Sequence, residues 1–215
     1  MSHEYINSIE FKQSKHKSEK NKILVIVGPS GVGKDTIMQT IFEKYPNILK
    51  KGVTHTSRKI RKGEKEGYNY YYITEEEFLK LKEQDAFFEF NYYNKNYYGI
   101  SKMELENQKK SNKIFYVIIA IKGAKYINKC NIPANFVAIL PPDEDTLSKR
   151  LKRRGTESEE SIKIRLKIAK SELKEIEKCD FFNLRIYNDD LNDAIKDMEL
   201  FLKNAYPNNF NLSEN

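Results

Sequence analysis

The chain has 215 residues, of which 39% are hydrophobic and 32% charged, and it carries a formal net charge of +7. With 9 glycines and 6 prolines it does not have the composition of a disordered or fibrous chain, and its 2 cysteines cannot build a disulfide framework. No apolar run approaches the roughly 18 residues of a membrane span, so we expect one large soluble domain or two small ones, in a reducing compartment.

Residues 1–21 are polar and contain no apolar segment, so they do not form a secretory signal, and we expect a disordered leader. Their acidic residues and lack of arginine also argue against an organellar transit peptide. We therefore expect a cytoplasmic protein, with a plastid-like or mitochondrial organelle as the alternative.

The folded chain is predicted to begin with a strand over residues 23–27, which are all apolar and mostly β-branched. Such a run is typical of a strand that is buried on both faces of a sheet. A glycine-rich turn follows, and then an amphipathic helix over residues 34–45. Residues 50–61 and 68–73 are predicted to be extended, with a turn at residues 62–64 between them.

The middle of the chain carries two signals for a helix start. Thr74 is predicted to cap a helix that runs to Gln84, and Glu77 stands where a capping box requires it. Residues 87–98 are predicted to form short aromatic strands and turns. Ser101 is then predicted to cap another helix, which runs to about residue 110.

Two buried strands and a helix are predicted in the next segment. Residues 114–121 and 135–140 are apolar runs of strand length, and two prolines end the second of them. Residues 145–153 are predicted to be helical, and residues 155–160 to form a polar loop.

The last third of the chain begins with a long predicted helix over residues 161–178, whose apolar residues recur on a single stripe. A final strand over 181–187 and a final helix over 191–205 are followed by a tail, residues 206–215. Strands that alternate with helices predict an α/β fold with a doubly wound, mostly parallel sheet.

Residues 28–36, with the sequence GPSGVGKDT, stand between a buried strand and a helix. Phosphate-binding loops occur in this position, because glycines let successive backbone N–H groups surround a phosphate and the helix N-terminus adds positive charge. Lys34 can reach the β and γ phosphates of a nucleotide as a point charge. The motif therefore predicts the binding of a nucleoside triphosphate.

One position departs from that motif. Asp35 follows the lysine, where a serine or threonine normally places its hydroxyl on Mg²⁺. Thr36 is next, but one step along a helix turns a side chain by about 100°. A carboxylate could bind Mg²⁺ directly or through water, although it also repels phosphate. Asp35 is therefore the candidate residue for binding Mg²⁺.

Several separated motifs resemble those of guanylate kinases, and together they cover residues 22–205. They are, in chain order, the loop at 28–36, Thr56-Ser57-Arg58 with Arg61, Gly63-Glu64, Gly67-Tyr68-Asn69-Tyr70, Asn96-Tyr97-Tyr98-Gly99, Lys149-Arg150-Leu151, Arg154-Gly155-Thr156-Glu157 and Asn188-Asp189-Asp190-Leu191. The Gly-Lys-Asp-Thr variant and Tyr98-Gly99-Ile100 look most like the plant organellar branch of that family.

The resemblance implies a P-loop NTPase fold with a core of residues 22–50 and 112–205. A small mixed subdomain at about 51–100 would bind GMP, and a helical lid at about 143–165 would close over the site. The implied reaction moves the γ-phosphoryl of ATP onto GMP, with Mg²⁺ as the cofactor.

By resemblance, two overlapping sets of residues would serve the ATP side of the site. The ATP-binding residues would be Gly28, Ser30, Gly31, Val32, Gly33, Lys34, Asp35, Thr36 and Asn188. The catalytic residues would be Lys34, Arg150, Arg154 and Arg165. Clustered cations suit this chemistry, because two anionic groups must meet in the transition state.

The resemblance also assigns the GMP side of the site. Arg58, Arg61, Tyr70 and Tyr98 would bind the GMP phosphate, which suits the planar fork of arginine. Glu89 would accept hydrogen bonds from guanine N1 and N2, because adenine offers no such pair of donors. Thr54 would help to hold the base through its hydroxyl.

The chain departs from the family at two further places. Ile118 and Ala120 stand where the family usually carries two aspartates at the end of a buried strand, and Ile100 stands where many members carry a hydroxyl that touches guanine. These changes favour an alternative function, a guanylate-kinase-like interaction domain with weakened catalysis. The arginines and Lys34 oppose it, because scaffold members tend to lose such residues.

Two further functions receive less support from the sequence. Another nucleoside monophosphate kinase is opposed by Glu89 and by the pair Arg58 and Arg61. RNA binding through the basic residues would lack any recognised nucleic-acid motif. We therefore expect ATP and GMP as substrates, no nucleic-acid or membrane partner, and a monomer, with a dimer as the alternative.

Overall fold

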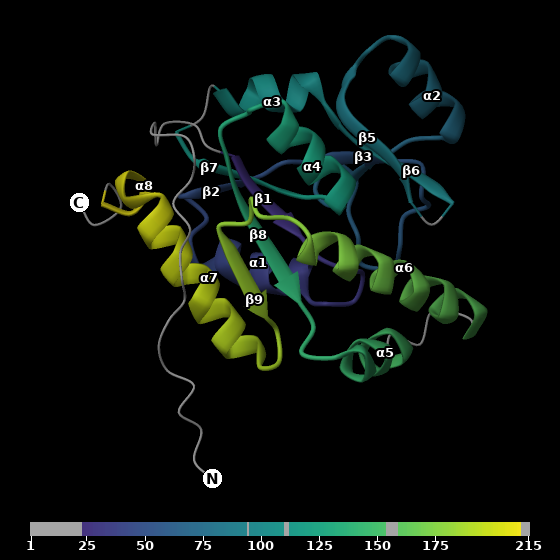
Figure 1. Ribbon diagram of the computed structural model, residues 1–215. Helices are drawn as coiled ribbons and strands as arrows, with labels where there is room; N and C mark the ends of the chain where they lie inside the picture. Colours follow the sequence, from purple (N-terminus) through teal and green to yellow (C-terminus); the bar gives the residue numbers. More distant parts are fainter. Residues whose placement is uncertain (1–22, 94, 110–111, 154–158, 212–215) are drawn as a thin grey trace.

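The computed structural model describes residues 23–93, 95–109, 112–153 and 159–211, which form two sheets with helices around them (Figure 1). The larger sheet has five strands in the order β2-β7-β1-β8-β9, and every neighbouring pair is parallel. These strands are β1 (Ile23–Val27), β2 (Leu49–Lys51), β7 (Ile114–Ile118), β8 (Ala134–Leu140) and β9 (Leu184–Tyr187). This sheet confirms the predicted α/β class.

The second sheet has four strands in the order β4-β3-β6-β5 and is mixed. The pair β3 and β4 is parallel, whereas β6 runs antiparallel to both β3 and β5. The strands are β3 (Thr54–Thr56), β4 (Tyr70–Tyr72), β5 (Phe87–Tyr93) and β6 (Asn96–Ser101). In Figure 1 this sheet lies at the upper right, and α2 lies at its outer end.

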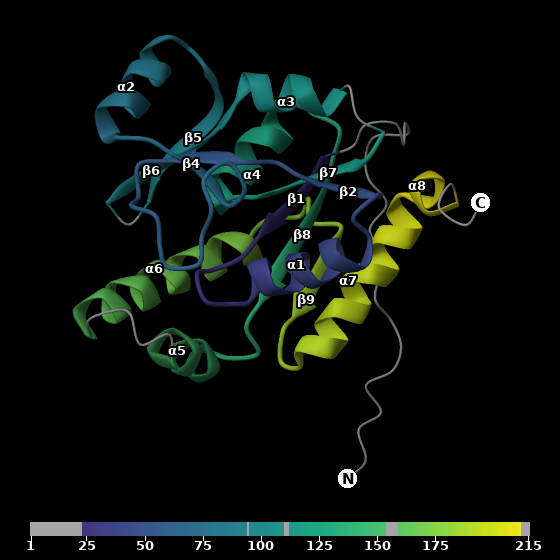
Figure 2. The same ribbon diagram turned by 180° about the vertical axis from the view of Figure 1, so that it is seen from behind.

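Helices cover both faces of the five-stranded sheet, and Figure 2 shows α1 and α7 side by side on the face turned away in Figure 1. The helices are α1 (Lys34–Lys44), α2 (Glu75–Glu83), α3 (Lys102–Lys109), α4 (Ile121–Lys129), α5 (Glu144–Arg153), α6 (Glu159–Glu177), α7 (Leu191–Ala205) and α8 (Pro207–Asn211). Among the described residues no helix combines the length and apolar character needed to cross a membrane.

The strand β1 divides the core into two clusters, because successive side chains of a strand point to opposite faces of the sheet. Leu24 and Ile26 pack in the cluster that includes α1 and α7, whereas Val25 packs in the cluster that includes α4. All five residues of β1 are buried. Burial of one such side chain contributes about 1.5–3 kcal/mol, so β1 is the central support of the loop that follows it.

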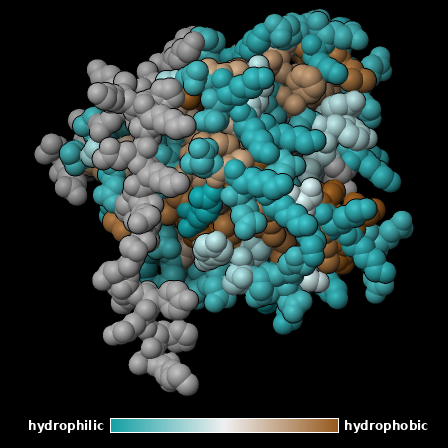
Figure 3. Space-filling view, in the orientation of Figure 1, coloured by the Kyte–Doolittle hydropathy of each residue, from teal (hydrophilic) through white to brown (hydrophobic). Residues whose placement is uncertain are grey.

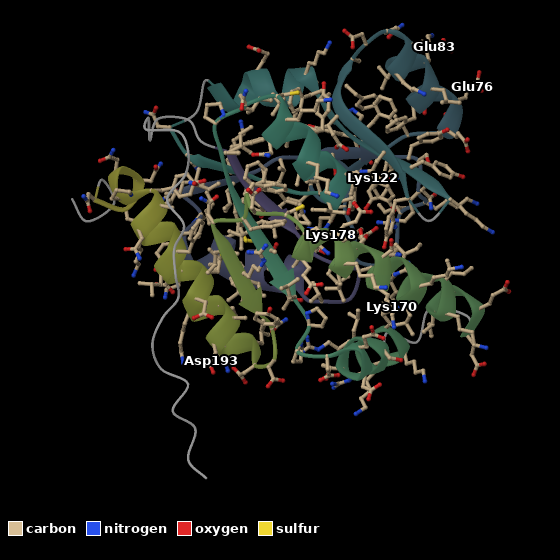
Figure 4. The ribbon with its side chains drawn as sticks, viewed as in Figure 1. Glu76, Glu83, Lys122, Lys170, Lys178 and Asp193 are labelled. Carbon is tan, nitrogen blue, oxygen red and sulfur yellow. The ribbon has the colours of Figure 1, made fainter. Side chains whose placement is uncertain are left out.

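The surface of the molecule is strongly charged. Figure 3 shows hydrophilic residues over most of the visible face. Glu76 and Glu83 on α2 and Asp193 on α7 are exposed examples (Figure 4).

Two predicted caps are confirmed. The Thr74 hydroxyl accepts a hydrogen bond from the Glu77 backbone, and the Glu77 carboxylate accepts one from the Thr74 backbone, which completes a capping box. The Ser101 hydroxyl accepts a hydrogen bond from the Glu104 backbone at the start of α3. Each such cap contributes about 1 kcal/mol.

The predicted strand over residues 114–121 was wrong at its end. The strand stops at Ile118, and α4 begins at Ile121, a helix that the sequence pattern did not reveal. Ile119 and Ile121 are buried in one cluster, so the apolar run continues through the turn from strand to helix. An apolar run without a polar break hides such a boundary.

Three smaller corrections concern segment limits. The extended segment over residues 50–61 contains two short strands, β2 and β3, which belong to different sheets. The last strand begins at Leu184 and not at 181, and part of the predicted tail forms α8. The polar loop predicted over 155–160 lies largely outside the described residues.

Candidate active site

A cavity of about 370 Å³ lies where the ends of three parallel strands face the second sheet. The ends of β1, β2 and β7 supply residues that line it, and ligands of parallel α/β sheets bind beyond the carboxyl ends of the strands. Of the residues predicted for the site, the cavity is lined by Gly28, Ser30, Gly31, Gly33, Lys34, Asp35, Thr36, Thr54, Arg58, Arg61, Tyr70, Glu89, Tyr98 and Arg165.

Glycines are required in the loop between β1 and α1 because its backbone lies against other groups. Gly28 has φ +152°, and a Cβ there would lie 2.1 Å from the Ile139 carbonyl oxygen. Gly33 has φ +103°, and a Cβ there would lie 2.4 Å from the Asn188 amide nitrogen. The loop leads directly into α1, whose N-terminus offers unpaired backbone N–H groups and positive charge to an anion.

Lys34 lies across this loop. Its ammonium group donates hydrogen bonds to the Gly28 carbonyl at 2.6 Å and to the Pro29 carbonyl at 2.9 Å. The side chain therefore occupies the centre of the loop, at the point where a bound phosphate would need a cation.

Three predicted residues stand behind the loop and do not line the cavity. Asn188 is buried, and its amide nitrogen donates to the Val32 carbonyl at 2.7 Å. Val32 is itself fully buried. Arg150 donates to the backbone carbonyls of Asn188 at 2.8 Å and Asp189 at 3.2 Å. These residues fix the position of the loop from below, and Arg154 lies outside the described residues.

The helix α6 brings two charged side chains to the cavity. Arg165 is buried, and its guanidinium donates to the Ser30 hydroxyl of the loop at 3.2 Å. Glu172 lies two turns further along the same helix and also lines the cavity. Glu172 was not among the predicted site residues, although its spacing of seven residues from Arg165 places both on one face.

The Glu172 carboxylate is half-buried with few hydrogen-bond partners. Its Oε2 atom is buried without a hydrogen-bond partner among the described residues. Burial raises the pKa of Glu172 to about 7, although the positive charge of Lys34 acts in the opposite direction. A carboxylate therefore lies on the loop side of the cavity, where the end of β7 offers only the apolar side chains of Ile118, Ile119 and Ala120.

Lys51 and Asp35 add two opposite charges to the cavity, and the sequence did not predict that they lie in the same site. Lys51 lies at the end of β2 and lines the cavity together with Asp35 from the start of α1. Burial lowers the pKa of Lys51, whereas the charges of Asp35 and Glu64 act to raise it. Asp35 is exposed, so it can approach a hydrated cation.

On the second sheet, Arg58 is held by a carboxylate and by aromatic rings. Its guanidinium donates to both oxygens of Glu64, at 2.8 and 3.0 Å, and lies 5.4 Å from the centre of the Tyr70 ring. Burial acts to raise the pKa of Glu64, but hydrogen bonds from Tyr72, Arg61 and Arg58 outweigh it and lower this pKa below its ordinary value. The arginine is thus oriented before any ligand binds.

Tyr70 and Tyr98 lie beside this arginine, with ring centres 6.0 Å apart. Burial raises the pKa of Tyr70 above its ordinary value, so its hydroxyl stays protonated and can donate a hydrogen bond. Thr54 is the cross-strand neighbour of Tyr70 in the pair of β3 and β4. The second sheet thus presents cations and hydroxyl donors that can bind a second anionic group.

Glu89 lies on β5 and is buried beside the first turn of α4. A Cβ on Gly123 would lie 2.7 Å from the Glu89 carboxyl group, so any larger residue there would displace this carboxyl group from its position. Burial raises the pKa of Glu89 to about 7, against the effect of a hydrogen bond from the Asn91 amide. Asn91 and Tyr93 were not predicted for the site, and they line the cavity from the same strand.

The cavity can therefore bring two phosphate groups together. The loop and Lys34 offer one anion site, and Arg58 with its neighbours offers another within the same space. The described residues contain no cluster of three or more His, Cys, Asp or Glu side chains that could hold a metal ion. The arrangement suits phosphoryl transfer by positioning and charge stabilisation.

Comparisons with known proteins agree with this geometry. The family model described as "Guanylate kinase" matches residues 20–205. A guanylate kinase from Schizosaccharomyces pombe is 37% identical over 86% of this chain and 92% of its own length, and one from Carboxydothermus hydrogenoformans is 38% identical over 85% and 88%. The crystal structure of guanylate kinase from Anaplasma phagocytophilum is similar, with a TM-score of 0.65 and 28% identity over 85% of this chain and 84% of that one.

Proposed function

The chain belongs to the guanylate kinase family and is an ATP:GMP phosphotransferase, and we propose that the cavity between the two sheets is its active site. ATP binds at the loop between β1 and α1, and GMP binds over the second sheet. The observation that carries this proposal is that one cavity contains both anion sites, the loop with Lys34 and the cluster around Arg58.

At the ATP end, backbone N–H groups of residues 28–36 bind the phosphates, as the P-loop sequence requires. Lys34 leaves the Gly28 and Pro29 carbonyls to bind the phosphates as a point charge. Asn188 is buried under the loop and donates to the Val32 carbonyl, so in this proposal it serves the ATP site by holding the loop in position.

At the GMP end, Arg58, Arg61, Tyr70 and Tyr98 bind the GMP phosphate. Glu64 orients Arg58 by an ion pair in which Nη2 of the arginine donates to both carboxylate oxygens, which limits the ordering needed when GMP binds. Glu89 accepts hydrogen bonds from guanine N1 and N2, and the Thr54 hydroxyl contacts the base. In this division, residues 51–100 form the GMP-binding subdomain, and residues 22–50 and 112–205 form the core.

The arginines of the lid segment, residues 143–165, stabilise the charge of the transferred phosphoryl group. Arg165 already contacts the loop through Ser30, which makes it the best placed of the three. Arg150 contacts backbone carbonyls behind the loop and reaches the nucleotide only if those contacts are released. Arg154 has the same proposed role and lies outside the described residues.

The Mg²⁺ ion that accompanies ATP fits the residues of the cavity. Mg²⁺ keeps several waters and takes one or two carboxylates, so it needs no larger protein cluster. Asp35 and Glu172 would hold its hydration shell. Oε2 of Glu172, which has no hydrogen-bond partner in the described part of the chain, is the atom that such a shell would satisfy. When bound, Mg²⁺ would neutralise charge on the β and γ phosphates.

No general base is needed in this proposal, because a GMP phosphate oxygen is already an anionic nucleophile. The residues of the chain instead hold the two phosphates in line and exclude water between them. Lys34, Arg58 and Arg165 offset the repulsion between the two anions.

A coupled assay of ADP release with GMP, AMP, UMP and CMP as acceptors tests the proposal. We expect turnover with GMP and less than about one hundredth of it with the others, because only guanine offers the donors that Glu89 accepts. Turnover with another nucleotide would indicate a different monophosphate kinase. ATP and GMP binding without turnover would indicate the interaction domain.

We also propose that the chain acts as a monomer in the cytoplasm and binds neither nucleic acid nor membranes. Sedimentation at micromolar concentration and fractionation of cells would test the first two points. No part of the proposed mechanism requires a second copy of the chain.

A further inference from the structure

The strand β5 presents a row of polar side chains to the cavity. Glu89, Asn91 and Tyr93 are two residues apart, so they share one face of the strand, and all three line the cavity. Phe90 and Tyr92 alternate with them and are exposed. The amide of Asn91 is therefore placed directly beside the carboxylate that we propose as the guanine reader.

The contact between these two side chains orients the amide. The Asn91 nitrogen Nδ2 donates to Glu89 Oε1 at 3.4 Å, and the reverse orientation would set two oxygens against each other. Only one of the two Nδ2 hydrogens is used in this contact. Asn91 Oδ1 is buried without a hydrogen-bond partner among the described residues. The half-buried amide therefore keeps hydrogen-bonding capacity that a ligand in the cavity can use, with the second Nδ2 hydrogen as a donor.

The neighbours of Glu89 on β6 cannot replace this amide. The residue opposite Glu89 is Ile100, which is apolar and 1% exposed. The residue opposite Asn91 is Tyr98, which lies in the proposed phosphate site. Asn91 therefore lies between the carboxylate that reads the base and the group that binds the phosphate.

The order of atoms along this row matches one nucleobase edge. Glu89 offers two acceptors, and the Asn91 nitrogen next to them offers a donor. Guanine carries the complementary order of donor, donor and acceptor at N2, N1 and O6, whereas adenine carries an acceptor at N1 and a donor at N6. We propose that Asn91 is a specificity-determining residue that donates a hydrogen bond from Nδ2 to guanine O6.

This inference rests on the proposed function, because it requires guanine to lie against Glu89. The oxygen O6 has two lone pairs, so Thr54 and Asn91 can both donate to it. Asn91 then raises the affinity for guanine nucleotides without contributing to the binding of ATP.

Calorimetric titration with GMP in the absence of ATP tests the contact. We expect Asn91→Ala and Asn91→Leu each to raise the dissociation constant of GMP about threefold to tenfold, the effect of losing one hydrogen bond. Leucine keeps the shape of asparagine, so it separates the lost donor from a cavity. Tyr92→Ala, on the opposite face of β5, is the matched control and should leave the GMP affinity within about twofold.

A second ligand shows whether the contact is direct. 6-Thio-GMP keeps the N1 and N2 donors but replaces O6 by sulfur, which accepts hydrogen bonds poorly. If Asn91 contacts O6, Asn91→Ala should change the affinity for 6-thio-GMP by less than about twofold. Equal losses for the two ligands would overturn the direct contact, because Asn91 would then act only by holding Glu89.

The remaining outcomes are also decisive. An unchanged affinity for GMP in both Asn91 variants, with correct folding shown by circular dichroism, would overturn the inference. If the unsubstituted chain does not bind GMP, the proposed function itself fails, and this inference fails with it.

Discussion

The two ends of the cavity are built by different means. At the end that we propose for ATP, backbone geometry determines the site, because the glycine loop can surround phosphates and Lys34 is hydrogen-bonded to the carbonyls of Gly28 and Pro29. At the GMP end, side chains determine it, because Arg58 is held by Glu64 and Tyr70 and the carboxylate of Glu89 is buried beside Asn91.

This difference has a consequence for how each end responds to substitution. Where backbone N–H groups form the site, the loop binds the ligand as a unit, and one cationic side chain supplies much of the remaining stabilisation. A side-chain site distributes its effect over several hydrogen bonds, so single substitutions there should have smaller and graded effects. We therefore expect the effect of a substitution to decrease from the ATP end to the GMP end.

The largest loss of turnover is expected from a substitution at the proposed ATP end. Lys34→Ala removes the cation at the centre of the loop, so turnover should fall about a thousandfold while the melting temperature stays within a few degrees. Turnover in the coupled ADP-release assay is the measurement. Lys178→Ala, just beyond α6 and not among the residues of the cavity, is the matched control (Figure 4). Normal turnover of the Lys34 variant would show that this loop is not the donor site.

A smaller effect is expected where Arg58 is oriented. Glu64→Ala removes the carboxylate that accepts hydrogen bonds from Arg58 and Tyr72, so the KM for GMP should rise about tenfold. Glu64→Gln keeps one acceptor and should give an intermediate KM. The KM for ATP should not change in either variant. Equal KM values for GMP in all three proteins would contradict an orienting role for Glu64.

The pH dependence of GMP binding should reflect the burial of Glu89. Burial raises the pKa of Glu89 to about 7, and only the ionised carboxylate accepts two hydrogen bonds from guanine. The ionised fraction grows as pH rises through 7, so the affinity for GMP should increase about tenfold between about pH 6 and pH 8. The second ionisation of the GMP phosphate, near about pH 6, contributes separately.

Glu89→Gln provides the control for that pH profile. It should retain only the part that belongs to the phosphate of GMP, because glutamine does not ionise. The pKa of Glu172 is also raised to about 7, but Glu172 lies at the ATP end and titrates in both proteins. Identical profiles for the two proteins would show that Glu89 does not contact the base.

The sequence predicted the proposed ATP end of the cavity more completely than the proposed GMP end. Spacing alone placed Gly28, Gly33 and Lys34 in one loop, because a strand, a turn and a helix N-terminus are local features. The contacts of Asn188 were not predictable in this way. Its position behind the loop depends on β9 lying two strands from β1, which is a feature of the whole sheet.

The proposed GMP end of the cavity depends on contacts between segments that are far apart in the sequence. Glu89 was predicted from a motif, but its burial against Gly123 requires α4, which the apolar run concealed. Lys51 and Glu172 have no motif of their own, and only the fold brings them to the cavity. Ile118 and Ala120, which stand where the family usually carries two aspartates, form an apolar part of the cavity wall.

The central claim is that the two ends bind different nucleotides, and calorimetric titration of two variants with each nucleotide tests it most directly. Lys34→Ala should weaken ATP and leave the dissociation constant of GMP within about twofold. Glu89→Gln should weaken GMP and leave that of ATP within about twofold. A result in which either variant weakens both nucleotides to the same extent would contradict the account, because the two ends would then not be separate sites.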